Sequence, residues 1–274
     1  MLALKFLGVV VAVVGVAAVA FNATAYAFRC WAWTPSCEDD EPLGLLTAFA
    51  AFLVECGATM LLVLTWPFGA LLDSIDGRPL HGGTPVALIH GWALNPASLW
   101  LLRRRLLQHG LGPVRIFAYA SRQVDVEQAA TELRDFVAAF QRECPGPLTL
   151  IGHSLGGLVA RYYLRRYPAH GVRRLVTLAT PHQGTLAARF GRLRRLLPNS
   201  PLIRRLNSAD HVPDQFDAIA IASPFDAVIV PPTAAGWSGA GNITVRGVGH
   251  ITMLLSRRIV ELVVENLRVE SRTA

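Results

Sequence analysis

Charged residues are scarce in this chain. Asp, Glu, Lys and Arg make up 16% of the 274 residues, whereas 52% are hydrophobic. The stretch 6–28 has no charged residue, and the stretch 43–72 has only Glu55. Both stretches exceed the roughly 20 apolar residues that cross a bilayer core. We therefore predict a membrane region over residues 1–72, with transmembrane helices over about 6–28 and 43–72.

Cysteine is also rare, with four residues. Cys56 and Cys144 lack the spacing and the neighbouring histidine of a metal site, so we expect them to be buried small hydrophobic residues. We predict no metal and no cofactor. Cys30 and Cys37 lie in the same segment between the two apolar stretches. These two cysteines form either a disulfide or a pair of free thiols.

Nucleic-acid motifs are missing despite a formal net charge of +7. The arginines occur in short scattered groups without the interleaved aromatic residues of a protein that reads bases. An anionic membrane surface is the simpler partner for such groups. We predict a membrane partner and no nucleic acid; the sequence leaves the oligomeric state unknown.

The segment 29–42 between the apolar stretches has one basic residue, Arg29, and four acidic ones at positions 38–41. Because basic residues are retained in the cytoplasm, this segment is expected outside. A hairpin then crosses the inner cell membrane twice and leaves the rest of the chain in the cytoplasm. The alternative is a signal peptide cleaved after Ala27, although the first run exceeds the ~15 apolar residues of such peptides. Glu55 is expected to face the other helix or a neighbouring chain, unless a shorter span begins at Cys56.

Short apolar runs alternate with helix-length amphipathic segments in the remainder of the chain. This pattern is typical of a doubly wound, mostly parallel α/β sheet. We predict a linker over 73–83 and a catalytic domain over 84–274, with a short cap over about 186–214. Strands are predicted over 85–90, 114–120, 148–152, 174–179, 218–222 and 243–248, and helices over 99–109, 124–144, 155–166 and 252–267.

One pentapeptide indicates nucleophilic catalysis: Gly152-His153-Ser154-Leu155-Gly156. It follows an apolar strand and opens a helix, which is the setting of a nucleophile elbow. The strained turn needs almost no side chain at its flanking positions, and the helix N-terminus favours a developing anion. Ser154 is therefore the predicted nucleophile.

The acid and the base follow Ser154 in the order expected for this elbow. His250 comes just after a predicted strand, at the carboxyl edge where the sites of parallel sheets form. His211 lies in the polar cap and is the less favoured base. Asp226 follows the strand 218–222, whereas Asp217 precedes it and would lie at the opposite edge; Asp210 and Asp214 belong to the cap. We predict His250 as general base and Asp226 as the residue that orients it.

An oxyanion hole requires two backbone donors. One is expected from Leu155, directly after the nucleophile, and the other from the loop after the first strand, His90-Gly91-Trp92. We assign the second donor to Trp92, with Gly91 as the turn. The competing role for His90, a second catalytic base, is less favoured because the turn displaces it from Ser154.

Five segments together resemble bacterial triacylglycerol lipases and esterases of the α/β-hydrolase superfamily: Ile89-His90-Gly91-Trp92, residues 152–161, residues 177–185, Ser223-Pro224-Phe225-Asp226 and Gly247-Val248-Gly249-His250. The resemblance covers nearly all of residues 85–267. It implies the α/β-hydrolase fold and hydrolysis of carboxylic esters through an acyl-enzyme, with Ser154, Asp226 and His250 as the triad. It also implies that Thr180, Pro181 and His182 line the rim of the site; with Gly91 and His153 they are the predicted substrate-binding residues.

The predicted membrane region favours lipid-like or small esters as substrates. A membrane acyltransferase with the same triad and a membrane scaffold with a degenerate hydrolase domain are the alternatives. The segment 186–206 alternates apolar residues with arginines, so it is either a mobile lid that meets lipid or an ordinary cap helix.

Overall fold

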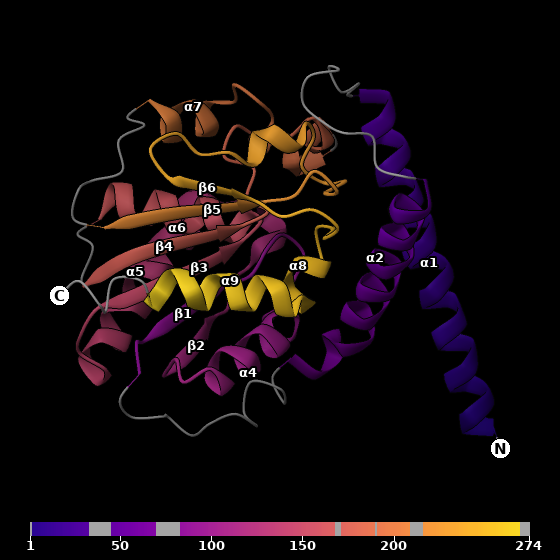
Figure 1. Cartoon of the computed structure of the whole chain (residues 1–274), viewed down its shortest axis with the longest axis horizontal. Helices are drawn as coiled ribbons and strands as arrows, with labels where there is room; N and C mark the ends of the chain where they lie inside the picture. The colour runs from indigo at the N-terminus through magenta and orange to yellow at the C-terminus, as the bar shows by residue number, and fades with distance from the viewer. Residues whose placement is uncertain are drawn as a thin grey trace.

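A six-stranded sheet forms the centre of the domain that follows the apolar N-terminal region (Figure 1). The computed structural model describes residues 2–32, 45–69, 83–167, 171–189, 191–208 and 216–268. The six strands run parallel, in the order β2-β1-β3-β4-β5-β6. They are β1 (Val86–Ile89), β2 (Val114–Phe117), β3 (Leu148–His153), β4 (Val172–Leu178), β5 (Asp217–Ala222) and β6 (Gly241–Thr244). The predicted α/β class with a parallel sheet is confirmed.

The central strands are buried on both faces. Every residue of β1 and β3 is buried, which explains why their sequences are continuous apolar runs rather than alternating ones. Strand β2 lies on one side of β1 and β3 on the other, so the direction of winding reverses between β1 and β3. The loops that leave these two strands diverge there, and ligand sites of open parallel sheets form in that crevice.

Helices cover both faces of the sheet and give the domain three layers (Figure 1). Ala87 and Ile89 of β1 pack with α5 and α6, whereas Val86 and Leu88 pack with α4 and α9. This alternation follows from the two-residue period of a strand. The helices of the domain are α4 (Trp100–Gln108), α5 (Val126–Glu143), α6 (Leu155–Arg166), α7 (Pro201–Asn207), α8 (Thr252–Leu255) and α9 (Arg257–Arg268).

The C-terminal elements differ from the predicted ones. Strand β6 ends at Thr244 because Gly247 turns the chain with a φ of 78°. The single helix predicted over 252–267 is divided at Ser256, whose extended backbone ends α8. The Ser256 hydroxyl accepts a hydrogen bond from the N–H of Ile259 at 3.4 Å and so caps α9.

The predicted cap contains the short 3₁₀ helices η4 (Leu186–Arg189) and η5 (Gly191–Leu196), followed by α7. The predicted linker lies outside the described residues except for Gly83, and so does the end of the cap, with Asp210, His211 and Asp214. Cys37 and the acidic segment 38–41 also lie outside them.

Two long apolar helices precede the domain, α1 (Leu2–Ala32) and α2 (Leu45–Thr65). They pack against each other: the Asn22 side chain donates a hydrogen bond to the Thr59 hydroxyl at 3.1 Å, and the rings of Tyr26 and Phe52 lie edge to face, 5.7 Å apart. By length and composition alone, both helices can cross a membrane. We call this pair the N-terminal hairpin.

The N-terminal hairpin lies against the domain on the side where the strands end (Figure 1). After α2, the carbonyl of Trp66 accepts a hydrogen bond of 2.7 Å from Asn95, in the loop that follows β1. In the middle of α2, Glu55 contacts Ile251, in the loop that follows β6. The domain therefore lies beside α2 along much of its length, and the prediction that Glu55 faces the other helix or a neighbouring chain is wrong.

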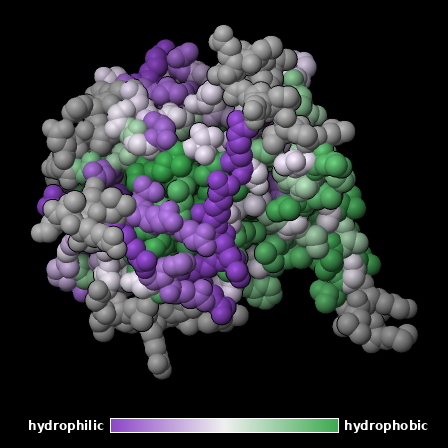
Figure 2. Space-filling model, viewed as in Figure 1, coloured by the Kyte–Doolittle hydropathy of each residue, from purple (hydrophilic) through white to green (hydrophobic). Residues whose placement is uncertain are grey.

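On the face seen in Figure 2, the N-terminal hairpin is largely apolar and coloured green. Both helices have exposed large apolar side chains, among them Phe6, Val9, Val13, Val16, Phe21, Leu46, Phe49, Leu53, Leu61 and Val63. An apolar surface of this extent is typical of a membrane or protein contact rather than of a face in water.

Candidate active site

Ser154 lies in a strained turn between β3 and α6, with a φ of 53° and a ψ of −122°. The flanking glycines are required by close backbone contacts. A Cβ on Gly152 would lie 2.6 Å from the Cα of Gly157, and a Cβ on Gly156 would overlap the carbonyl oxygen of Ile89. The geometry is that of a nucleophile elbow, and it explains each glycine of the pentapeptide.

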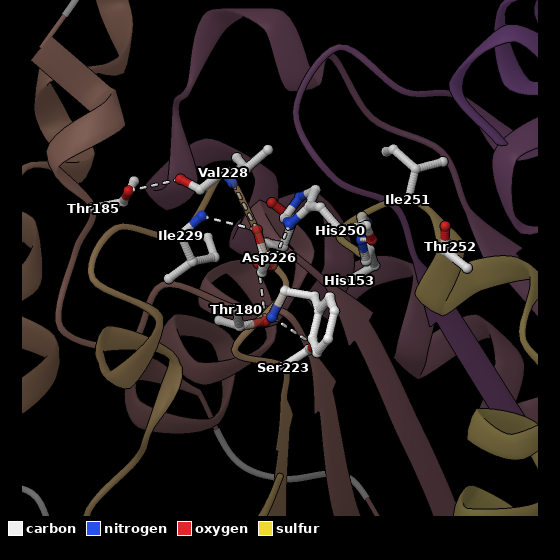
Figure 3. Close-up of polar contacts among 12 residues, drawn as sticks. His153, Thr180, Thr185, Ser223, Asp226, Val228, Ile229, His250, Ile251 and Thr252 are labelled. Atoms are coloured by element: carbon white, nitrogen blue, oxygen red, sulfur yellow. Dashed lines mark hydrogen bonds and ion pairs between the residues drawn. The ribbon is translucent and has the colours of Figure 1, made fainter. Parts of the chain in front are cut away.

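His250 and Asp226 form a buried pair (Figure 3). The His250 Nδ1 lies 2.7 Å from the Asp226 Oδ2, and the two residues are 6% and 2% exposed. The other carboxylate oxygen, Oδ1, accepts hydrogen bonds from the N–H groups of Val228 at 2.7 Å and Ile229 at 3.0 Å. These two donors fix the rotation of the carboxylate, so one oxygen faces the imidazole and orients it.

The environment of His250 favours its charged form. Burial lowers the pKa of His250, but the charge of Asp226, the hydrogen bond that His250 donates to Asp226 and the charge of Glu55 all raise it, and the pKa lies above its ordinary value of 6.5. A negative partner stabilises an imidazolium in this way when a histidine accepts a proton.

His250 contacts the nucleophile elbow by way of the His153 side chain. The two imidazole rings are 4.8 Å apart, and the His153 Nε2 lies 3.0 Å from the His250 carbonyl oxygen, to which it donates a hydrogen bond. His153 directly precedes Ser154. In the described residues, no hydrogen bond is recorded for the Ser154 hydroxyl; such bonds are often long before substrate binds.

The loop after β1 contacts the nucleophile directly. A Cβ built on Gly91 would lie 3.0 Å from the Cβ of Ser154, which is closer than an ordinary contact, so the approach favours glycine. Within the described chain, the backbone N–H groups of Trp92 and Leu155 donate no recorded hydrogen bond. Leu155 is the first residue of α6, where helical N–H groups lack internal acceptors. Both predicted donors are thus available to an anion.

His90 is held away from this chemistry. Its Nδ1 lies 3.0 Å from the Gly91 carbonyl oxygen, and its ring stacks on Tyr119 with the centroids 4.6 Å apart. Burial lowers the pKa of His90 to about 4. The contacts fit the prediction that the β1 loop turns His90 away from Ser154.

Three of the predicted substrate-binding residues lie in the interior rather than on the rim. Thr180 is 1% exposed, and its hydroxyl donates a hydrogen bond to the Ser154 carbonyl oxygen at 3.0 Å. His182 is fully buried and contacts the Thr177 hydroxyl at 2.9 Å; burial and the charge of Arg161 hold its pKa well below 6.5. Pro181, between them, is also buried. These contacts support the elbow from behind, and the binding of substrate by this segment stays a prediction.

His153 has a similar supporting position, at 1% exposed. Burial and the charge of His250 hold its pKa well below 6.5, so its imidazole is neutral. A neutral ring that donates from Nε2 leaves Nδ1 as an acceptor, and among the described residues this atom, beside Gly91, has no hydrogen-bond partner. Its contacts favour support of the His250 loop over the predicted contact with substrate.

Two residues of the N-terminal hairpin contact the site, and the sequence analysis assigned neither to it. Tyr26 of α1 donates a hydrogen bond to the carbonyl of Phe225, beside Asp226, at 3.0 Å. Glu55 of α2 accepts hydrogen bonds from the loop after His250. The only signal in the sequence was a single carboxylate within an apolar stretch.

In the described chain, no group of three or more His, Cys, Asp or Glu residues could hold a metal ion.

This chain is similar to known proteins over part of its length. A family model described as palmitoyl protein thioesterase matches residues 112–216. A pimeloyl-[acyl-carrier protein] methyl ester esterase of Shewanella woodyi is 33% identical over 109 residues, which cover 39% of this chain and 40% of that enzyme. An uncharacterized Nostoc protein, alr2406, is 34% identical over 96 residues, 31% of this chain and 37% of its relative. The matches thus span less than half of these relatives.

Solved structures show the same fold over the domain. Lipase BlEst2 of Bacillus licheniformis superimposes with a TM-score of 0.60 at 14% identity, over 70% of this chain and 94% of that one. Lipase B of Aspergillus fumigatus gives 0.59 at 18% identity, over 69% and 53%. With the parallel sheet and the elbow, these similarities show that the chain has the α/β-hydrolase fold.

Proposed function

We propose that this chain is a serine esterase that hydrolyses carboxylic esters through an acyl-enzyme. The observation that carries the proposal is the buried pair of His250 and Asp226, 2.7 Å apart, next to a strained serine. The similarity to a thioesterase family and to a methyl ester esterase of Shewanella woodyi supports acyl transfer to water.

The residues supply each step of that reaction. The Ser154 oxygen attacks the ester carbonyl while the His250 Nε2 takes its proton. Asp226 keeps the other nitrogen of His250 protonated and stabilises the imidazolium. The N–H groups of Trp92 and Leu155 stabilise the oxyanion, aided by the positive end of the α6 dipole. His250 then protonates the leaving alcohol and activates water for deacylation.

Active-site labelling tests the chemistry. A fluorophosphonate probe is expected to label the full-length protein in detergent micelles, and Ser154→Ala is expected to abolish the labelling. Ser98→Ala is a matched control, because Ser98 is buried but bonded to the carbonyl of Asn95. Absence of labelling in the wild-type protein would contradict the proposal.

Hydrolysis of p-nitrophenyl esters from acetyl to palmitoyl tests the substrate. A lipid-like substrate predicts rates that rise with chain length, and a parallel series of acyl thioesters tests the thioesterase similarity. Equal, near-zero rates over both series, with the probe still bound at Ser154, would instead favour an acyltransferase, the alternative that uses the same triad.

We also propose that the N-terminal hairpin attaches the enzyme to the cytoplasmic face of the cell membrane. Its outward apolar surface supports attachment to lipid, and the arginine groups of the domain favour an anionic leaflet. A full crossing is less favoured: α2 has 21 residues and a length close to the roughly 30 Å bilayer core, so the loop that contacts Glu55 would lie within the hydrocarbon.

Thiol accessibility distinguishes the two arrangements. In a variant whose only cysteine is Cys30, which is exposed, an impermeant maleimide is expected to react in broken cells and not in intact ones. Reaction in intact cells would show that the hairpin crosses the membrane. Membranes washed with alkaline carbonate should keep the protein in either case, and its release would contradict membrane attachment.

A further inference from the structure

Glu55 has contacts that docking of an apolar helix does not require. Its Oε1 accepts a hydrogen bond of 2.6 Å from the N–H of Ile251, and its Oε2 accepts one of 3.0 Å from the N–H of Thr252 and another from the Thr252 hydroxyl. The residue is 3% exposed. A buried carboxylate is stable only when such donors surround it.

The loop that Glu55 binds is the one that carries His250. Ile251 and Thr252 directly follow the histidine, and Gly249 directly precedes it. The Glu55 carboxylate lies so close to Gly249 that a Cβ there would overlap its Oε2. Glu55 thus contacts the chain on both sides of His250.

The sheet gives this part of the site little support of its own. Strand β6 is at the edge of the sheet, has four residues, and none of them is buried, whereas all six residues of β3, which leads to Ser154, are buried. The nucleophile is therefore held by the core of the domain. The loop beyond β6 receives one hydrogen bond from His153 at the end of β3, and Glu55 supplies three contacts from outside the sheet.

The other helix of the hairpin has an equivalent contact. The Tyr26 hydroxyl donates a hydrogen bond to the carbonyl of Phe225, directly before Asp226. The two helices therefore contact the loop of the base and the loop of the acid. Glu55, Asp226 and His153 are the titratable groups that interact with His250, and Tyr26 interacts with Glu55 and Asp226.

We propose that Glu55 is a positioning residue for His250, and that the N-terminal hairpin is for this reason a structural part of the active site. The inference rests on the proposed esterase function. Its physical basis is orientation: a displacement of about 1 Å in a catalytic group can cost about 100-fold in rate. The hairpin then has a role in the reaction in addition to membrane attachment.

Glu55→Gln tests the proposal in the full-length protein. Glutamine keeps the size of the side chain but has one acceptor oxygen, so its NH₂ would face an N–H or hydroxyl donor. With a short, soluble p-nitrophenyl ester, we expect kcat to fall about 10- to 100-fold and KM to stay within about twofold. The acidic limb of the pH profile should move to lower pH, because one negative charge that raises the pKa of His250 is removed.

Asn22→Ala is the matched control, because Asn22 bonds Thr59 within the hairpin and not the domain. It should keep kcat and the pH profile of the wild-type protein. A Glu55→Gln protein with wild-type kcat and pH profile would overturn the proposal. So would equal losses in Glu55→Gln and Asn22→Ala, since these would report hairpin packing alone.

Gly249→Ala provides a second test from the other side of the contact, useful where Glu55→Gln does not accumulate. Its Cβ should lower kcat by displacing the carboxylate. The double variant Gly249→Ala/Glu55→Ala should then have a higher kcat than the product of the two single-variant effects predicts. Additive effects would overturn the proposal. Fluorophosphonate labelling at Ser154 separates this inference from the esterase proposal: an unlabelled wild-type protein contradicts the latter, whereas a labelled one with unaffected Glu55 and Gly249 variants contradicts only the former.

Discussion

Asp226→Asn is expected to inactivate the enzyme without unfolding it, because the two oxygens of Asp226 have different partners. Oδ1 accepts N–H groups from Val228 and Ile229, while Oδ2 faces the Nδ1 of His250. The single oxygen of asparagine must take the Oδ1 position, since an NH₂ there would face two donors. The NH₂ then faces His250 and forces its proton from Nδ1 to Nε2.

A histidine protonated at Nε2 cannot accept the proton of Ser154. In serine proteases, the equivalent exchange lowers kcat about 10⁴-fold, or about 5.4 kcal/mol of transition-state stabilisation. We expect a loss of this size in kcat for p-nitrophenyl butyrate, with the thermal midpoint close to that of the wild-type protein. Asp226→Ala is the comparison: it leaves the N–H groups of Val228 and Ile229 unpaired, at about 1–3 kcal/mol for the buried group of Ile229, and should also lower the free energy of unfolding. A folded Asp226→Asn protein within tenfold of wild-type kcat would refute the assignment of Asp226 as the orienting acid.

Three further predictions follow from the described contacts. Gly157→Ala should lower kcat/KM about 100-fold, because the new Cβ overlaps the Thr180 hydroxyl that bonds the Ser154 carbonyl; unchanged kinetics would contradict this support. The kcat/KM for a neutral ester should fall as pH decreases through the pKa of His250, above 6.5, since the protonated imidazole is no base; a profile that stays level down to about pH 5 would contradict the assignment. Glu127→Gln, which breaks ion pairs of 2.6 and 3.4 Å to partly exposed arginines of the cap, should change the free energy of unfolding in urea by less than about 1 kcal/mol, and a larger loss would show that the cap is held electrostatically.

The elbow could be predicted from the sequence because its determinants are local. Ser154 needs a strand before it, a helix after it and glycines two residues away on either side, and all of these lie within one short segment. The order of Asp226 and His250 along the chain adds the partners, because successive parallel strands deliver their following loops to the same edge of the sheet.

Whether a side chain points into the interior or toward the site could not be predicted in the same way. Thr180 and His182 belong to a segment that reaches the site, which the sequence indicated, but their side chains turn inward. The direction is set by contacts that no local pattern records: a hydrogen bond from Thr180 to the Ser154 carbonyl and one between His182 and Thr177. The end of β6 was also misplaced, because the valines that follow it look like strand residues until the turn at Gly247 is known.

The contact between Glu55 and the His250 loop joins residues 196 positions apart, so no periodicity or spacing predicts it. The sequence nevertheless indicated that Glu55 has a partner, because a carboxylate in the middle of an apolar stretch needs hydrogen-bond donors. A membrane crossing offers none in its hydrocarbon part, and the loop after β6 offers three. An unsatisfied charge in an apolar helix is thus evidence for a partner elsewhere in the same chain. In this chain, that partner is the loop that carries the proposed catalytic base.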